Sequence, residues 1–185
     1  MTSERREFYR IEDEIVVNFS HVNPHSTLPN LDELEKQLPV SFQLIQELQG
    51  IKWEAKQSLQ PIDKKPEVQS YLSKLDKRIQ LAGEIAMRQY LSEHAARRAV
   101  SISGNGLRVV VDSPLKMDSL VMVELILPES IAAILCYAKV VKCTPLEQQY
   151  DLVVTFERIR EVDRDAIIGH IMRQESKILR NHKVV

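Results

Sequence analysis

The segment "VSISGNGLRVVVD", residues 100–112, joins a β-strand pattern to residues that strand interiors usually exclude. Around the glycines, most residues are β-branched or apolar, and from Ala99 onward the apolar residues recur with the period of two expected of a strand. Two serines and two glycines interrupt this pattern between residues 101 and 106. Glycine inside a strand marks a bulge or a close approach of the backbone to a ligand, and hydroxyls and exposed N–H groups can donate to an anion or a base edge. We therefore expect a strand that forms one wall of a binding site; a hairpin turn or a bulge without a ligand is the alternative.

Three more strand candidates follow this segment, each separated from the next by turn residues. They read "LVMVELILP" (120–128), "AAILCYAKVVKC" (132–143) and "YDLVVTFERI" (150–159). In the first of them, both faces are apolar, which indicates a strand covered on both sides, as in a barrel wall that a helix covers. The apolar residues of its two faces are Val121, Val123, Leu125 and Leu127 on one side and Leu120, Met122 and Ile126 on the other. The last segment, from about Asp163, is expected to be that covering helix, with a stripe that contains Ile167, Ile171 and Ile178.

Another strand is predicted near the N-terminus, where Ile15, Val17 and Phe19 alternate with other residues and share one face. The chain thus holds five or more strand candidates, and a helical segment separates the first from the rest. Closing the strands into a small antiparallel barrel is the economical arrangement, because closure removes exposed sheet edges. The expected fold class is α+β, with a helix at the C-terminal end.

The segment between the first strand and the others changes to a helical period. Asn30 can cap a helix, with Glu33 completing a capping box, and Pro39 predicts a break near Leu38. Pro66 suits the first turn of a second helix, which is expected to extend to about Arg97 and to be roughly 45–50 Å long at 1.5 Å per residue. Its apolar stripe steps by four and three residues in the manner of a heptad and comprises Val68, Leu72, Leu75, Ile79, Ala82, Ala86 and Gln89.

These long helices present more apolar surface than a small barrel can cover. We therefore expect residues 30–97 to hold several copies of the chain together as a dimer or a tetramer. A helical hairpin that packs only on its own barrel is the alternative.

Composition limits the possible functions. The 185 residues suit one domain with a large appendage, and a formal net charge of -1 provides no global field for nucleic acid or anionic lipid. No apolar run approaches the roughly 20 residues that span a bilayer, and no signal peptide is recognised, so a cytoplasmic location is expected. Cys136 and Cys143 are expected to be unpaired thiols on opposite faces of one strand. His21 and His25 flank a proline-containing loop and do not suggest a metal site, and no catalytic constellation stands out, so no enzyme is expected.

The N-terminal stretch "RREFYR", residues 5–10, places three arginines around two aromatic residues. Arg6 and Arg10 are separated by three residues, and this spacing alone is not specific, since Arg160 and Arg164 repeat it. The position immediately before a strand, together with the serine- and glycine-containing segment later in the chain, makes the first pair a candidate site. A frayed, charged terminus is the alternative.

Taken together, the two motifs resemble the PilZ family of bacterial receptors for cyclic di-GMP, whose pattern is RxxxR before the first strand and [D/N]xSxxG on the second. Arg6 and Arg10 match the first element, and Ser103 and Gly106 match the serine and glycine of the second. Ser101 departs from the family's Asp or Asn. The resemblance covers residues 5–22 and 99–180. It implies a PilZ-type barrel formed by residues 1–22 and 98–185. Residues 30–97, which the resemblance does not cover, are then an insertion, and their helical pattern makes them the expected oligomerisation segment.

The resemblance also implies roles for individual residues. Arg6 and Arg10, with Arg5 as a third contact, would hold the phosphates and guanines of cyclic di-GMP. Phe8 and Tyr9 would pack back onto the barrel and direct the arginines. Ser103 and the Gly106 backbone would face a guanine or a ribose. Ser101 also belongs to the expected site, but it lacks the acceptor strength of Asp or Asn, which is worth roughly ten- to a hundredfold in affinity.

The function that the resemblance implies is a non-enzymatic receptor without cofactor or metal. It would bind cyclic di-GMP, form a homo-oligomer and relay the signal to an unknown protein partner in motility, pili or biofilm formation. One alternative is an oligomeric scaffold or adaptor that has lost ligand binding. Another is a small-barrel nucleic-acid binder, which the near-neutral charge and the 5% aromatic content disfavour.

Overall fold

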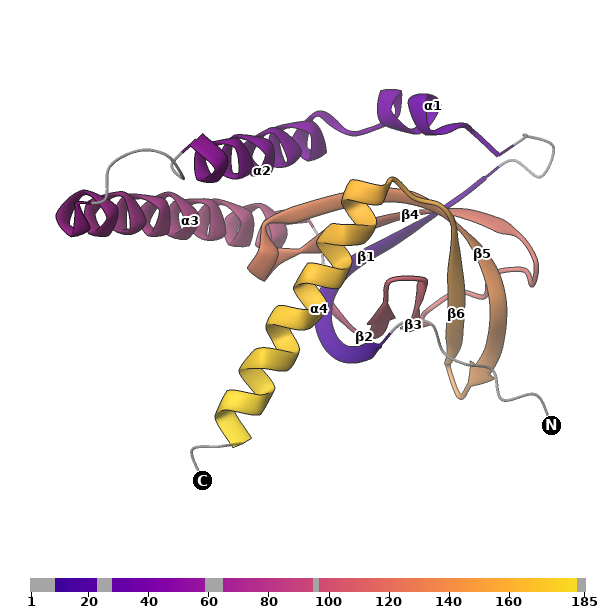
Figure 1. Cartoon of the computed structure of the whole chain (residues 1–185). Coiled ribbons are helices and arrows are strands. Elements are labelled where there is room, and N and C mark those ends of the chain that lie inside the picture. The colour runs from indigo at the N-terminus through magenta and orange to yellow at the C-terminus, as the bar shows by residue number, and fades with distance from the viewer. Residues whose placement is uncertain (1–8, 23–27, 59–64, 95–96, 183–185) are drawn as a thin grey trace.

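A computed structural model describes residues 9–22, 28–58, 65–94 and 97–182. In this part of the chain, six antiparallel strands form a closed barrel in the order β1-β2-β3-β6-β5-β4 (Figure 1). The strands are β1 (Arg10–His21), β2 (Arg97–Ser103), β3 (Gly106–Val111), β4 (Leu120–Leu127), β5 (Ala132–Leu146) and β6 (Gln149–Arg158). The predicted small barrel of an α+β fold is confirmed.

The segment 100–112 is a hairpin rather than one strand. Ser103 pairs with Gly106, and residues 104–105 between them form the turn. The chain thus gains one more strand than the pattern of apolar residues indicated, because a turn this short interrupts the strand period by only two residues.

The first strand closes the barrel by pairing with two neighbours in succession. Residues 10–16 of β1 pair with β2, and residues 16–21 pair with β4. Val16 lies at the change of partner and is fully buried. Because β1 precedes the helical segment and β2 follows it, this pairing joins two parts of the chain that are distant in sequence.

The barrel interior is filled by alternate residues of all six strands. The helix α4 (Glu161–His182) adds Ile167 and Ile171 to this core. Members with exposed fractions of at most 1% are Ile15, Val100, Ile102, Leu107, Val121, Val123, Leu125, Leu127, Ile134, Cys136, Ala138, Val140, Leu152, Val154 and Ile167. Beyond this contact, α4 continues away from the barrel, so its C-terminal part extends from the body of the molecule (Figure 1).

A second apolar cluster lies on the outside of β4 and β5. It is covered by α1 (Leu31–Lys36) and the start of α2 (Val40–Ser58). Its buried members are Val16, Leu34, Leu38, Phe42, Ile126, Ile131, Ala133, Leu135 and Tyr137. The expectation that the C-terminal helix covers this face is therefore wrong, because α4 contributes to the interior core instead.

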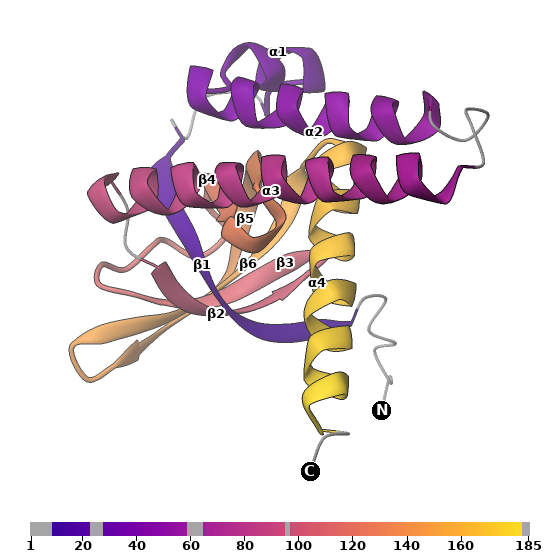
Figure 2. The same cartoon turned by 90° about the vertical axis from the view of Figure 1, so that its left-hand side faces the viewer.

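The helical signals in the sequence are confirmed at their expected positions. Asn30 caps α1, since its side chain accepts from the N–H of Glu33 at 2.8 Å and its own N–H donates to the Glu33 carboxylate at 2.9 Å. The chain breaks around Pro39 between α1 and α2, and Pro66 begins α3 (Pro66–His94), a helix of 29 residues. The helices α2 and α3 project beyond the barrel on the same side of it (Figure 1), and α3 crosses in front of the barrel in the view of Figure 2. Within the described ranges, no helix has the length and apolar character needed to cross a bilayer.

The two cysteines are free but do not lie on opposite faces of β5. Cys136 is fully buried in the barrel core, and Cys143 packs against the same core. The β5–β6 register shifts between Val140 and Lys142. This irregularity moves the alternation by one residue, so both thiols face inward.

Gly106 is required by close packing between strands. A Cβ at this position would lie 2.1 Å from the carbonyl oxygen of Val154, a backbone atom of the neighbouring β6. Gly50 in α2 is different, because a Cβ there would meet nothing within 4 Å.

The two glycines therefore predict opposite effects of the same substitution. Gly106→Ala should lower the free energy of unfolding by about 1–3 kcal/mol or more, which is typical of overpacking. Gly50→Ala should raise it by up to about 1 kcal/mol, because alanine favours a helix interior. Urea unfolding followed by circular dichroism measures both. A Gly106→Ala protein with the wild-type midpoint would contradict this packing.

Candidate functional site

The site predicted from the motifs lies on the outer face of the barrel. Arg10, the first residue of β1, is exposed and pairs with Ser103 of β2, which in turn pairs with Gly106 of β3. Directly opposed residues on neighbouring strands have Cβ positions about 4.5–5.5 Å apart. The structure therefore brings Arg10 to the serine and glycine of the later motif, with Thr155 of β6 at the end of the same row. Arg5 and Arg6 lie outside the described residues.

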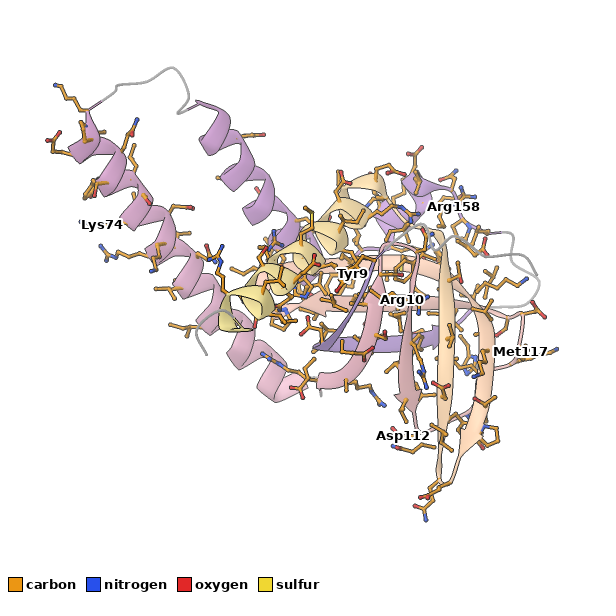
Figure 3. All side chains as sticks on the ribbon, turned by 60° about the horizontal axis from the view of Figure 1, so that its bottom comes forward. Tyr9, Arg10, Lys74, Asp112, Met117 and Arg158 are labelled. Carbon is orange, nitrogen blue, oxygen red and sulfur yellow. The ribbon has the colours of Figure 1, made fainter. Side chains whose placement is uncertain are left out.

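Tyr9 does not pack back onto the barrel as the sequence analysis expected. Its side chain is 62% exposed, immediately before β1 (Figure 3). A tyrosine that is this exposed gains little from burial, so it does not fix the direction of Arg10. Phe8, the other aromatic residue of this expectation, lies outside the described residues.

Ser103 is used by the fold itself. Its side chain is buried, and its hydroxyl donates to the carbonyl oxygen of Gly106 at 3.1 Å. The hydroxyl oxygen of Ser103 also accepts a hydrogen bond from the N–H of Asn105 at 3.4 Å. These bonds close the β2–β3 turn. In the structure, Ser103 therefore stabilises the conformation of that turn.

The tip of that turn is held from two directions. Arg164 of α4 donates to the carbonyl oxygen of Gly104 at 2.6 Å and to the side-chain oxygen of Asn105 at 2.9 Å. The N–H of Phe156 in β6 donates to the Asn105 carbonyl at 2.8 Å. The turn next to Arg10 is therefore held in place by hydrogen bonds from both α4 and β6.

Ser101 belongs to the adjacent row of outward-facing residues. It pairs with Glu12 of β1 on one side and Arg108 of β3 on the other. The burial pattern places Glu12 and Arg108 on the exposed face, because Ile11, Leu107 and their alternates face the core. This row alternates anion, hydroxyl and cation across the strands.

Arg108 is anchored by a carboxylate on β6. Its Nε donates to Oδ1 of Asp151 at 2.6 Å, and Lys142 lies 3.6 Å from the other carboxylate oxygen. Asp151 is only 3% exposed, because these two cationic side chains cover it at the barrel surface. The hydrogen bond from Arg108 lowers the pKa of Asp151 more than burial raises it, and the positive charges of Arg108 and Lys142 lower it further.

A second polar connection links β1 to α4 beside this wall. His170 is 1% exposed; its Nε2 lies 2.5 Å from Oδ2 of Asp13, and its Nδ1 lies 2.7 Å from Oγ of Ser130. Arg173 donates to the same Ser130 oxygen at 2.8 Å. The Ser130 hydrogen is then directed to Nδ1, and Nε2–H is directed to Asp13, which assigns the tautomer from the network.

The pKa of the Asp13 carboxyl is held below its usual range. Partial burial opposes its ionisation, but hydrogen bonds from His170 and from the N–H of Glu14 outweigh burial. A serine, a histidine and an aspartate also form the triad of many hydrolases, with the carboxylate on Nδ1 and the serine on Nε2. Here the two nitrogens are exchanged and the imidazole is buried, which favours a structural tie between β1 and α4.

Sequence reasoning missed the residues that support the site. Arg164 was recognised only as part of a repeated arginine spacing, and His170 was not singled out. Asp151 lies in a strand whose pattern gave no reason to expect an ion pair. The sequence does show charged residues within apolar patterns, but such a residue alone does not identify the side chain with which it pairs.

The ion pair of Asp151 predicts a stability difference that depends on pH. Asp151→Asn should lower the urea midpoint at neutral pH, because Arg108 and Lys142 lose their anion. Since the pKa of Asp151 is lowered from 3.8 by folding, its contribution is complete above pH 3.8 and is lost as pH falls through the folded pKa. The mutant and the wild type should therefore converge in acid. Asp165→Asn, an exposed carboxylate on α4, is the control. Equal midpoints for Asp151→Asn and wild type at pH 7 would contradict the role of this pair.

Comparison with known proteins shows the family. The chain resembles a tetrameric PilZ domain protein of Xanthomonas campestris, described as self-assembled through an unusual helical bundle, with 18% identity and a TM-score of 0.55 over 94% of this chain and 92% of that one. An inhibitor of motility from Bacillus subtilis is 21% identical, with a TM-score of 0.38 over 46% of this chain and 44% of that one. No curated protein matches the chain.

The sequence profile of the PilZ domain matches residues 75–173. The match begins inside α3 and ends inside α4, so β1 and Arg10 lie before it. It covers more than half of the 185 residues. The chain belongs to the PilZ domain family.

Proposed function

We propose that this protein is a receptor for cyclic di-GMP that relays the binding event to a protein partner. The observation that carries the proposal is the register that sets Arg10 beside Ser103 and Gly106 on the outer wall of the barrel. Arg10 of the first motif and Ser103 and Gly106 of the second then belong to one surface, although one motif stands before the helical segment and the other after it.

The chemistry of the wall suits a dianionic dinucleotide. A guanidinium group can hold a phosphate with two parallel hydrogen bonds, donate to guanine O6 and N7, or stack on a purine. Arg10 offers such a group at the edge of the wall, and Arg5 and Arg6 precede it by a few residues. With a formal net charge of -1, the protein must attract its ligand through these local charges.

Binding at this wall has a short path to the rest of the molecule. Asp13 lies three residues after Arg10 on the same strand and is hydrogen-bonded to His170 of α4. The turn beside Arg10 is also held by Arg164 of α4. A ligand bound by Arg10 would therefore act on a strand and a turn that both contact α4. This contact is a route by which a partner could sense the ligand.

Calorimetric titration with cyclic di-GMP tests this proposal. The wild type should bind with a dissociation constant in the micromolar range or below. Arg6→Ala and Arg10→Ala should each weaken binding by about tenfold or more, because each removes a charge-assisted hydrogen bond. Arg98→Ala is the matched control, since Arg98 is paired with Asp112, the residue that follows β3. Absence of heat with the wild type at high ligand concentration would favour the alternative of a scaffold or adaptor.

We also propose that the helical hairpin assembles the protein into a dimer or a tetramer. Apolar side chains on α2 and α3 remain exposed in the single chain; on α3, Tyr71, Leu75, Ile79 and Ile85 are 68%, 38%, 52% and 66% exposed. On α2, Val40, Leu44 and Ile51 are 70%, 61% and 58% exposed. Helices with this much exposed apolar surface are stabilised by association. The Xanthomonas campestris neighbour, described as a tetramer formed through a helical bundle, supports this proposal.

Light scattering tests the assembly. The wild type should have a mass that is a multiple of the 21.3 kDa chain. Leu75→Asp combined with Ile79→Asp should reduce the mass toward one chain. The two carboxylates would lie on the face of α3 that is proposed to contact another copy, and assembly would bury them without partners. Lys74→Asp combined with Arg78→Asp alters the same turns on another side of α3 and should preserve the oligomer. A wild-type mass of one chain would contradict the proposal.

A further inference from the structure

Ser101 stands between two opposite charges on the outer wall. The register places Glu12 of β1 directly across from it on one side and Arg108 of β3 on the other. All three side chains alternate with residues of the barrel core, so they project from the same face. This row is adjacent to the row of Arg10, Ser103 and Gly106, and it therefore belongs to the surface on which the proposed ligand would lie.

The cation of this row is exposed yet held in place. The Arg108 side chain is 59% exposed, while its Nε is fixed by the 2.6 Å hydrogen bond to Asp151. The bond uses Nε, so it leaves the two terminal amino groups of the guanidinium out of the contact with Oδ1 of Asp151. The pKa of Arg108 is raised, first by the hydrogen bond to Asp151 and also by the charge of Glu12, so the carboxylate of Glu12 acts on this guanidinium.

The anion of the row is a stronger acceptor than the serine beside it. A serine hydroxyl offers one short, neutral group, whereas a carboxylate offers two charged oxygens that can accept a pair of parallel hydrogen bonds. Glu12 is exposed and carries a longer side chain than Ser101, so its carboxylate can extend over the space that the small serine leaves.

We propose that Glu12 and Arg108 together recognise the base edge of guanine, with Glu12 accepting from N1–H and the N2 amino group and Arg108 donating to O6. The inference rests on the proposed function and adds the residues that select the base. It also explains how the wall could tolerate Ser101: the acceptor would come from the neighbouring strand at the same level of the sheet.

This pair of charges distinguishes guanine from adenine. The Watson–Crick edge of guanine carries one acceptor, O6, beside two donors, N1–H and the N2 amino group. Adenine carries a donor at N6 and an acceptor at N1. Its N6 amino group would face the arginine, which is itself a donor, and its N1 lone pair would face the glutamate, which is itself an acceptor. Specificity arises because a mismatched polar edge leaves charged groups without partners.

The contact between Glu12 and the amino group can be tested by removing each side in turn. Calorimetry would compare cyclic di-GMP with cyclic di-inosine monophosphate, in which hydrogen replaces the exocyclic amino group. The wild type should bind the inosine ligand about ten- to a hundredfold more weakly, the range for losing a hydrogen bond to a charged group. Glu12→Ala should bind the two ligands with equal affinity, and cyclic di-AMP should bind the wild type more weakly than cyclic di-GMP.

Glu14→Ala is the matched control. Glu14 is exposed on the same face of β1, but it lies one row away, opposite Ala99. This variant should keep the wild-type preference for guanine over inosine. Thermal unfolding of all three proteins checks that an exposed substitution leaves the fold intact. For Arg108, the Arg108→Lys variant keeps a cation for Asp151 and should weaken binding of both ligands.

The outcomes separate this inference from the proposed function. If the wild type binds cyclic di-GMP but Glu12→Ala retains the full preference over the inosine ligand, Glu12 does not contact the base and the inference is wrong while the receptor function stands. Binding of neither ligand by the wild type would overturn both.

Discussion

The pairing of β1 with both β2 and β4 is the constraint on which the rest of the structure depends. It closes the barrel and sets the level at which the first strand meets the hairpin of β2 and β3. Gly106 permits this arrangement, because the backbone of β6 lies where any side chain would have to be. The glycine that marks the family's motif thus has a packing role that is independent of ligand binding.

Around this wall, polar groups are used mainly to hold the fold. Ser103 closes its own turn, Arg164 clamps the tip of that turn, and His170 ties β1 to η1 (Pro128–Ser130) and α4. Buried polar groups are costly unless they are paired, so each of these contacts also fixes the direction of its neighbours. The wall of β1, β2 and β3 is therefore held in one shape by contacts from α4 and β6.

Two surfaces of the molecule carry the two proposed activities. The wall of β1, β2 and β3 carries charged and small polar residues, while α2 and α3 carry exposed apolar residues and project beyond the barrel. The helical segment enters the chain between β1 and β2, so it leaves the barrel pairing intact while adding a separate surface. α1 and the start of α2 nevertheless cover β4 and β5, which makes the insertion part of the barrel's own packing.

The sequence by itself determined the local structure. Alternating apolar residues predicted the strands, Asn30 with Glu33 predicted the cap of α1, and Pro39 and Pro66 predicted the break and the start of the long helix. It also determined the family, through short motifs whose order along the chain can be read directly. These features depend on neighbouring residues, whose preferences are local.

Only the tertiary structure decided which residues share the site. Glu12, Ser101 and Arg108 form one row because of the register between β1, β2 and β3. The helical segment separates β1 from β2 in the sequence, and the alternation within one strand does not predict which residues pair across strands. The clamp by Arg164, the tie through His170 and the inward turn of Cys143 after an irregularity in β5 are decided in the same way. Such contacts arise when whole elements pack, because the position of each partner depends on every strand between them.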